Sequence, residues 1–266
     1  MIFVLWGEDK SCKNTLALSF PRPIVDMEFD VGGFKRACRN LPHLPIKDWY
    51  NNGEIILEQY AIPFQLGDID PVASIVRPSK RVTGMKELWY KFAAKYVEHL
   101  QNPNIASILV DTGTLLYEVT SAGYLQEKQE AQFDANGNLL PKEKLLTHLY
   151  PPVLYQQVNI RMRGFIYQAK RFDKNLILTH HASDVYGLVP GAGGALVEGR
   201  TGKRQLHGWG QLGDGADVVG YTYWNSTAKK PYFNVELAEV KELEGMVFEE
   251  PTYDKIQTVI SMIRGE

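Results

Sequence analysis

The sequence predicts an α/β fold in which a mostly parallel sheet is flanked by helices. Three short apolar runs are typical of strands buried on both faces of a sheet: Ile2–Trp6, Ile105–Val110 and Asn175–Leu178. Between these runs lie segments whose apolar residues recur at helical spacing. Strands that alternate with helices indicate right-handed crossovers, and such crossovers join parallel strands.

The other elements follow from local patterns. Further strands are expected at Pro23–Phe29 and Ile55–Ile62 and, as a closing hairpin, at Val218–Trp224 and Tyr232–Val240. Helices are expected at about Val82–Gln101, from Gly113 to about Gln132, from Pro152 to Phe172 and at Tyr253–Ile263. Two segments rich in turn residues are expected to be loops, Asp134–Pro141 and the long, mobile, glycine-rich Gly187–Gly215.

Composition indicates an ordinary globular protein. The chain has 266 residues, of which 44% are hydrophobic and 23% charged, and its formal net charge is −2. That charge excludes a molecule that is basic throughout but not a local basic stripe. Without visible repeats or a clear linker, we expect a single domain spanning residues 1–266.

Cysteine use and hydropathy predict a cytoplasmic location. Cys12 and Cys38 are the only cysteines, which is too few for a disulfide framework or a zinc site. The apolar N-terminal run is too short for a signal sequence and has no basic residues before it. No stretch is long enough to cross a bilayer, so no membrane association is expected.

A phosphate-binding loop is indicated directly after the first strand. Such a P-loop has the pattern Gly-x4-Gly-Lys-[Ser/Thr]: its amides and helix start hold phosphates, its lysine reaches the terminal phosphates and its hydroxyl binds Mg²⁺. Here Gly7 and Lys13 are in register. The remaining residues of the candidate nucleotide-binding loop are Lys10, Ser11, Cys12, Asn14 and Thr15.

Two positions depart from this pattern. Cys12 replaces the second glycine, and its Cβ would crowd a turn that must approach phosphate closely. Asn14 replaces the metal-binding hydroxyl, although its amide oxygen can still bind Mg²⁺. Thr15 faces away and would need a shifted loop to substitute. The alternative interpretation is a plain strand–turn–helix with a surface lysine.

Acidic residues follow two of the other predicted strands. Asp111 ends a buried strand, where a carboxylate could hold the water around Mg²⁺; it could also cap the next helix. Glu28 or, as second choice, Asp30 could position the attacking water, and both could equally serve the turn before Gly32-Gly33. We expect Asn14 and Asp111 to hold the metal.

Thr179-His180-His181 follows another buried strand and is expected beside the phosphates, where a polar group could sense the terminal phosphate. A zinc site is not expected there, because adjacent strand residues point to opposite faces.

A single-stranded DNA surface is predicted in the glycine-rich segment. Arg200, Lys203 and Arg204 supply cations, and Trp209 supplies a ring on which bases could stack. The alternative is a solvated loop.

With these pieces in place, the sequence resembles a family of bacteriophage AAA/RecA-like ATPases linked to phage recombination and single-strand annealing. The matching stretches are short but occur in the family's order, and they are Trp6–Leu18, Met27–Phe34, Gly84–Tyr90, Val110–Glu118, Asn159–Arg163 and Asn175–His180. The resemblance implies a RecA-like core, ATP with Mg²⁺ and action on single-stranded DNA.

The resemblance also implies roles for individual residues. Lys13 would hold the β- and γ-phosphates, Asp111 would organise Mg²⁺, Glu28 would position water and His180 would sense the nucleotide. The departures at Cys12 and Asn14 fall on the family's own phosphate motif.

The leading hypothesis is a phage-type ATPase that binds single-stranded DNA in recombination or replication, as a homo-oligomer in the host cytoplasm. The alternative is a P-loop module that has lost hydrolysis and serves as a nucleotide-binding or structural partner. A small-molecule kinase is disfavoured, because no arginine-rich lid is evident.

Overall fold

The computed structural model describes residues 1–40, 44–64, 69–70, 75–76, 81–132, 152–190 and 196–265. The turn cluster expected at Asp134–Pro141 lies outside these residues. Within them, no helix combines the length and the apolar character needed to cross a membrane.

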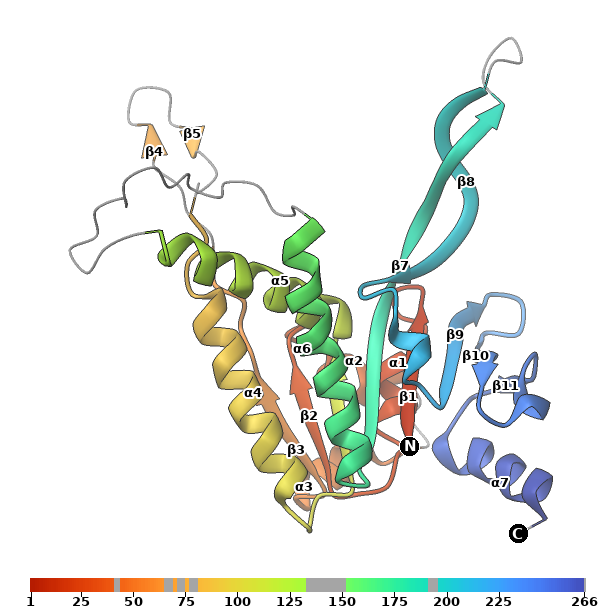
Figure 1. Cartoon of the computed structure of the whole chain (residues 1–266). Coiled ribbons are helices and arrows are strands. Elements are labelled where there is room, and N and C mark those ends of the chain that lie inside the picture. The colour runs from red at the N-terminus through yellow and green to blue at the C-terminus, as the bar shows by residue number, and fades with distance from the viewer. Residues whose placement is uncertain are drawn as a thin grey trace.

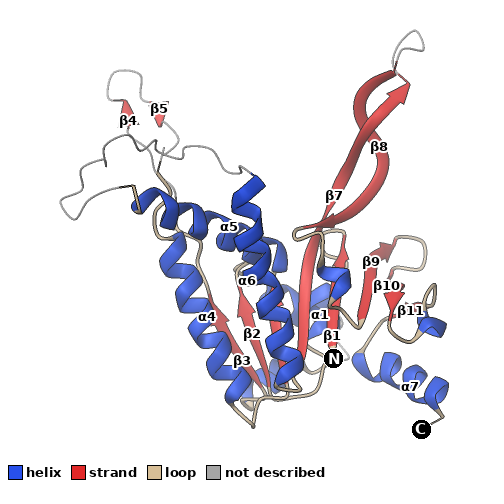
Figure 2. Ribbon diagram, in the orientation of Figure 1, coloured by secondary structure: helices blue, strands red, loops and turns tan. Residues whose placement is uncertain are grey.

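The described strands form one large sheet and one small sheet (Figures 1 and 2). The large sheet contains β1 (Ile2–Gly7), β2 (Ile24–Glu28), β3 (Ile55–Gln59), β6 (Ser107–Asp111), β7 (Asn175–Pro190), β8 (Leu196–His207), β9 (Val218–Asn225), β10 (Lys230–Ala238) and β11 (Val247–Glu249). Its order is β11-β10-β9-β1-β7-β6-β2-β3, with β8 paired to β7. The small sheet pairs β4 (Ile69–Asp70) with β5 (Ile75–Val76).

The centre of the large sheet is parallel. β1 pairs in parallel with β7 and β9, β6 with β7 and β2, and β2 with β3. Antiparallel pairing is confined to β9–β10–β11 and to β7–β8. This is the mostly parallel sheet flanked by helices that the sequence predicts, together with the expected C-terminal hairpin and helix.

Helices cover both faces of the sheet. One face carries α4 (Met85–Gln101), α5 (Gly113–Glu130) and α6 (Pro152–Arg171). The other carries α1 (Lys13–Ala17), α2 (Gly33–Asn40), α3 (Ile46–Asn51) and α7 (Tyr253–Arg264). The short helices α2 and α3 were not predicted. Single 3-10 turns, η2 (Leu212–Asp214) and η3 (Lys241–Leu243), follow β8 and β10.

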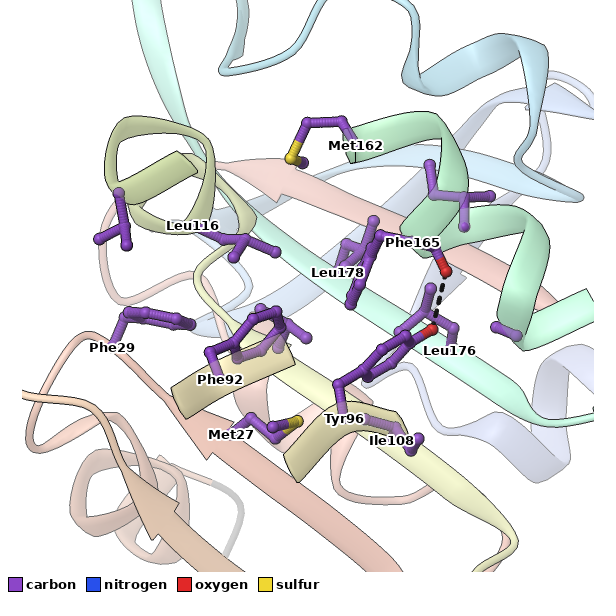
Figure 3. Close-up of a cluster of buried hydrophobic side chains, with 14 of the residues drawn as sticks. Met27, Phe29, Phe92, Tyr96, Ile108, Leu116, Met162, Phe165, Leu176 and Leu178 are labelled. Carbon is purple, nitrogen blue, oxygen red and sulfur yellow. Dashed lines mark hydrogen bonds between the residues drawn. The ribbon is translucent and has the colours of Figure 1, made fainter. Parts of the chain in front are cut away.

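The core beneath α4–α6 is rich in aromatic side chains. Phe92 lies against Phe29 and Phe165 with ring centroids 5.3 and 5.7 Å apart (Figure 3). The Tyr96 hydroxyl is buried and donates to the Phe165 carbonyl at 2.9 Å, which satisfies its polar atom inside the core. These contacts hold α4 and α6 against the sheet. They thereby fix the position of the edge that the carboxyl ends of the strands form.

The expectation of a long mobile loop at Gly187–Gly215 is wrong. β7 continues to Pro190 and pairs with β8, which ends at His207, so most of the described part of this segment belongs to a long antiparallel arm that projects from the sheet (Figure 1). Its β8 side chains are mostly exposed. Because the arm packs on the core only near its foot, at Leu206, the rest of its described residues lack the apolar alternation by which a strand is recognised.

Candidate functional site

The loop between β1 and α1 has an unusual backbone path. Gly7 has φ 149°, and a Cβ built there would lie 2.1 Å from the Thr222 carbonyl oxygen, so β9 requires glycine at this position. Lys10 and Cys12 have φ 61° and 68°, in the left-handed region. Cys12 therefore adopts a conformation that favours the glycine of the P-loop pattern. Burial raises the pKa of its thiol to about 11, so the thiol stays protonated at neutral pH.

Lys13 is the first residue of α1 and is buried. Its Nζ donates to the carbonyl oxygens of Gly7 and Glu8 at 3.1 and 2.6 Å. Burial lowers its pKa, and the carboxylates of Asp9 and Asp111 oppose that effect. Lys13 thus points its charge into the loop that it closes, and the carboxylate of Asp111 at the end of β6 is close enough to act on it.

Asp111 is at the centre of the polar groups at this edge. Its Oδ1 accepts from the Thr179 hydroxyl at 2.7 Å, and its Oδ2 accepts from the Asn14 amide. Burial raises the pKa of Asp111 to about 6, although both hydrogen bonds act to lower it. The alternative role as helix cap is filled by Thr112, whose hydroxyl accepts from the Leu115 amide at 3.2 Å.

Asn14, the second expected metal ligand, turns its nitrogen toward Asp111. In this arrangement the amide acts as a donor, whereas a metal needs its oxygen. Thr15 is fully buried, and its hydroxyl has no hydrogen-bond partner among the described residues. It does not line the cavity described below, as expected for a side chain that faces away.

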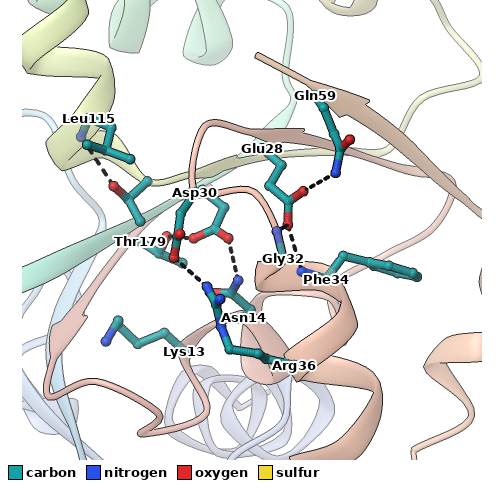
Figure 4. Close-up of polar contacts among 12 residues, drawn as sticks. Lys13, Asn14, Glu28, Asp30, Gly32, Phe34, Arg36, Gln59, Leu115 and Thr179 are labelled. Atoms are coloured by element: carbon teal, nitrogen blue, oxygen red, sulfur yellow. Dashed lines mark hydrogen bonds and ion pairs between the residues drawn. The ribbon is translucent and has the colours of Figure 1, made fainter. Parts of the chain in front are cut away.

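Glu28 holds a turn. Its Oε1 accepts from the amides of Gly32 and Phe34 at 3.1 and 2.8 Å, and its Oε2 accepts from Gln59 at 2.7 Å (Figure 4). The carboxylate is fully buried, so the turn interpretation describes the contacts it makes here. Asp30, by contrast, lines the cavity and forms an ion pair with Arg36.

Gly33 allows α2 to approach these groups. A Cβ at this position would lie 2.0 Å from Asp111 Oδ2 and 2.5 Å from Asn14 Nδ2. Any larger side chain would therefore push the start of α2 away from the Asn14–Asp111 pair. α2 then presents Arg36 and Arg39 to the cavity.

A cavity of about 440 Å³ lies between the loop, α2 and the end of β6. It is lined by Asp9, Lys10, Ser11, Cys12, Lys13, Asn14, Asp30, Gly33, Arg36, Ala37, Arg39, Asp111, Thr112 and His181. Within the described residues, the backbone amides of Lys10 to Lys13 donate to no protein acceptor. The expected loop residues and Asp111 thus share one cavity, together with two arginines.

His180 lies on the other face of the sheet. It is fully buried, and its Nδ1 lies 3.3 Å from the Thr114 hydroxyl and 3.2 Å from the His207 carbonyl. Burial lowers its pKa to about 3, so it stays neutral. Its side chain does not line the cavity, and the sensing role that the resemblance implies for it stays a prediction. Its neighbour His181 lines the cavity instead.

The expected DNA-contacting residues separate into two groups. Arg200, Lys203 and Arg204 are exposed on the β8 strand of the arm, where Arg200 and Arg204 lie 3.2 and 3.8 Å from Asp184. Trp209 is only 4% exposed and packs in the core beneath α6. The stacking ring expected at Trp209 is therefore not on the surface, because Leu212 and neighbouring core side chains bury it.

Sequence reasoning missed Gly33, Arg36, Arg39 and His181. The arginines stand three apart after Gly32-Gly33, a helical spacing that would have placed them on one face of a helix. His181 was set aside in favour of His180 because nothing in the sequence says which of two adjacent strand residues faces the loop.

Comparison with known proteins shows likeness to solved structures only. No protein-family model matches the chain, and no curated protein matches it. A solved structure that it resembles is the RadB recombinase, with 11% identity, a TM-score of 0.48 and coverage of 93% of this chain and 85% of that chain.

Proposed function

We propose that this chain is an ATP-binding protein, and an ATPase when active, that acts on single-stranded DNA in phage-type recombination or replication. The proposal treats residues 1–266 as one domain that assembles into a homo-oligomer in the cytoplasm. The observation that carries it is the shared cavity, in which Lys13, unpaired loop amides and Asp111 meet at the edge of a P-loop core.

The cavity suits phosphate. Lys13 supplies a buried cation, and the amides of residues 10–13 supply donors that the protein leaves unused. The Lys13 ammonium now donates to the carbonyl oxygens of Gly7 and Glu8, and a bound anion would replace these oxygens as its acceptor. Arg36 and Arg39 add positive charge at the same cavity, so a polyphosphate would contact donors on both sides.

The residues also suit Mg²⁺, which prefers carboxylate, carbonyl and water oxygens. Asp111 would organise the ion and its water, and a half-turn of the Asn14 amide would direct its oxygen to the same point. Such an ion would supply charge neutralisation for the phosphates. Because Asn14 is now a donor to Asp111, metal binding must break that hydrogen bond.

The remaining polar residues have distinct proposed roles. Asp30 lines the cavity and is therefore better situated than Glu28 to orient water, while Glu28 holds the turn that carries Asp30. His181 takes over from His180 as the nearer candidate for sensing the phosphates, and His180 would act only through the strand it shares with His181.

The DNA contacts are assigned to the arm. Its exposed cations, Arg200, Lys203 and Arg204, stand on one strand that projects beyond the sheet, where a flexible polyanion can reach them. Asp184 offsets part of this charge, so their contribution should depend strongly on salt.

A second candidate is a module that binds nucleotide without hydrolysing it. The Asn14–Asp111 hydrogen bond favours it, since the residue that should bring a metal ligand instead occupies the carboxylate. On this alternative, the cavity would hold a nucleotide and transmit its presence to the arm without turnover.

The test is nucleotide binding with Mg²⁺, with and without single-stranded DNA. Lys13→Ala should weaken ATP binding about 10- to 150-fold, because a charge-assisted hydrogen bond contributes about 1.5–3 kcal/mol. Lys47→Ala, which removes an exposed lysine on α3, is the matched control and should bind as the wild type does.

Phosphate release that rises with single-stranded DNA and is lost in Lys13→Ala would support the ATPase. Saturable ATP binding without release would support the second candidate. If neither ATP nor DNA binds to the wild type, both fail.

A further inference from the structure

Thr222 on β9 lies directly beside the start of the loop between β1 and α1. The parallel pairing of β1 with β9 sets Thr222 opposite Gly7. The two residues approach closely, because a Cβ built on Gly7 would lie 2.7 Å from the Thr222 hydroxyl oxygen. Thr222 is fully buried and does not line the loop cavity. Its side chain therefore contacts the loop from behind and leaves the ligand side free.

Two buried hydroxyls join Thr222 to this loop. The Ser11 hydroxyl donates to the Glu8 carbonyl at 2.7 Å, and its oxygen lies 2.6 Å from the Thr222 hydroxyl oxygen. Each hydroxyl has one proton, so when the Ser11 proton is on Glu8, Thr222 is the donor to Ser11. The Trp6 carbonyl, at 3.3 Å, is a more distant acceptor for the Thr222 proton. The hydrogen bonds thus form a chain from Thr222 through Ser11 to Glu8.

The Glu8 carbonyl at the end of this chain accepts two hydrogen bonds. One comes from Ser11 at 2.7 Å and the other from the Lys13 ammonium at 2.6 Å. Lys13 must leave this carbonyl when its ammonium contacts a phosphate. An acceptor that loses every donor away from water is costly, so the carbonyl needs the Ser11 proton once Lys13 has moved.

We propose that Thr222 is a positioning residue for phosphate binding: its hydroxyl holds Ser11 on the Glu8 carbonyl, which allows Lys13 to leave that carbonyl for a phosphate. This inference rests on the proposed function and adds a residue from a strand that does not reach the cavity. Thr222 itself contacts no ligand, and its effect passes through Ser11 and Glu8.

The burial of Ser11 explains why the Thr222 hydroxyl is needed. Ser11 is only 1% exposed, so water does not replace a missing partner. Without the Thr222 hydroxyl, the Ser11 oxygen loses the donor that fixes its rotamer, and its proton is no longer held toward Glu8. The Glu8 carbonyl would then depend on Lys13, and a phosphate would have to compete with it for the ammonium.

The experiment measures the affinity of the full chain for ATP with Mg²⁺ and, separately, for inorganic tripolyphosphate. Thr222→Val replaces the hydroxyl with a methyl group and should weaken both ligands about 5- to 10-fold, because the effect lies on the phosphates. Thr222→Ser keeps the hydroxyl and should bind both as the wild type does. Thr120→Val is the matched control, since it removes an equally buried hydroxyl that donates to the Leu116 carbonyl on α5.

A second measurement separates positioning from a merely structural role. In the Lys13→Ala background no ammonium has to leave Glu8, so Thr222→Val should change the affinity for ATP by less than about twofold. Ser11→Ala removes the middle of the chain and should weaken ATP by about the factor seen for Thr222→Val, with no further loss in the double variant. If Thr222→Val does not fold, Ser11→Ala with and without Lys13→Ala decides in its place.

The outcomes distinguish this inference from the function on which it rests. If the wild type binds neither ATP nor tripolyphosphate, the proposed function fails and the inference fails with it. If the wild type binds them but Thr222→Val binds equally well, only the role of Thr222 is overturned. An equal loss of affinity in the wild-type and Lys13→Ala backgrounds would also overturn it, because the hydroxyl would then act on the loop without regard to Lys13.

Discussion

The loop cavity and the β7–β8 arm both adjoin the middle of β7, at His181, yet they hold their charges in opposite ways. In the cavity, Lys13 and Asp111 are buried, and each has at least two hydrogen-bond partners. On the arm, Arg200 and Arg204 are exposed; Asp184 lies 3.2 and 3.8 Å from them, and Glu8 lies 3.9 Å from Arg204.

Because of this difference, substitutions in the two regions should affect different properties of the protein. A buried polar group that loses its partner costs about 1–3 kcal/mol, so changes in the cavity alter folding as well as ligand affinity. Exposed ion pairs contribute little, so changes on the arm should alter only the binding of a charged partner. The predictions below test that separation, beginning with the largest effect.

The largest effect is expected for Asp111→Asn, which should raise the free energy of unfolding and weaken nucleotide binding. The pKa of Asp111 is raised to about 6 in the folded protein, so the folded state binds this proton more tightly than the unfolded state does. Its ionisation therefore lowers the free energy of unfolding as pH rises from about 4 to about 6, by about 2–3 kcal/mol. Asparagine does not ionise, so the variant keeps the free energy of unfolding that the wild type loses over this pH range.

Urea unfolding at pH 4 and pH 7.5 checks the prediction. Asp111→Asn should gain stability relative to the wild type mainly at pH 7.5, while Mg²⁺-dependent nucleotide binding falls about 10- to 100-fold. An equal stability difference at both pH values would mean that Asp111 is not the group that titrates.

Restoring the P-loop pattern should have a smaller effect. Cys12→Gly relieves a non-glycine residue at φ 68°, and Asn14→Thr replaces the donor to Asp111 with a hydroxyl that can bind Mg²⁺. The double variant should bind Mg-ATP about 5- to 10-fold more tightly, measured by calorimetry. Unchanged affinity and turnover would show that loop geometry is not what limits the site.

The smallest effect is expected on the arm. Arg200→Ala and Lys203→Ala should leave the urea midpoint unchanged and reduce the slope of log affinity against log salt by about 0.7 for each charge removed. Salt titrations of a fluorescent single strand measure this slope, with Lys91→Ala on α4 as control. A loss of stability in the arm variants would contradict the comparison itself.

The central strands and long helices were predictable because their buried positions must carry apolar residues, and this leaves a regular pattern in the sequence. A strand buried on both faces, such as β1 or β6, must be apolar throughout, and α4 must repeat its apolar residues at helical spacing. Lys13 and Asp111 could be brought together for a related reason: the carboxyl ends of parallel strands meet at one edge.

Other features of the site were decided only by the tertiary structure, because they depend on contacts between segments far apart in the chain. Which of His180 and His181 faces the loop is set by the register of β7 against β1, and a shift of one residue would exchange them. The partners of Glu28 come from Gln59 and from a turn that the fold brings back to β2.

By itself, the sequence determined the parallel sheet, its order of buried strands and helices, and the loop that follows the first strand. The arm needed the folded chain. Its exposed strands carry no apolar pattern, and their backbone hydrogen bonds come from each other only once the sheet is complete.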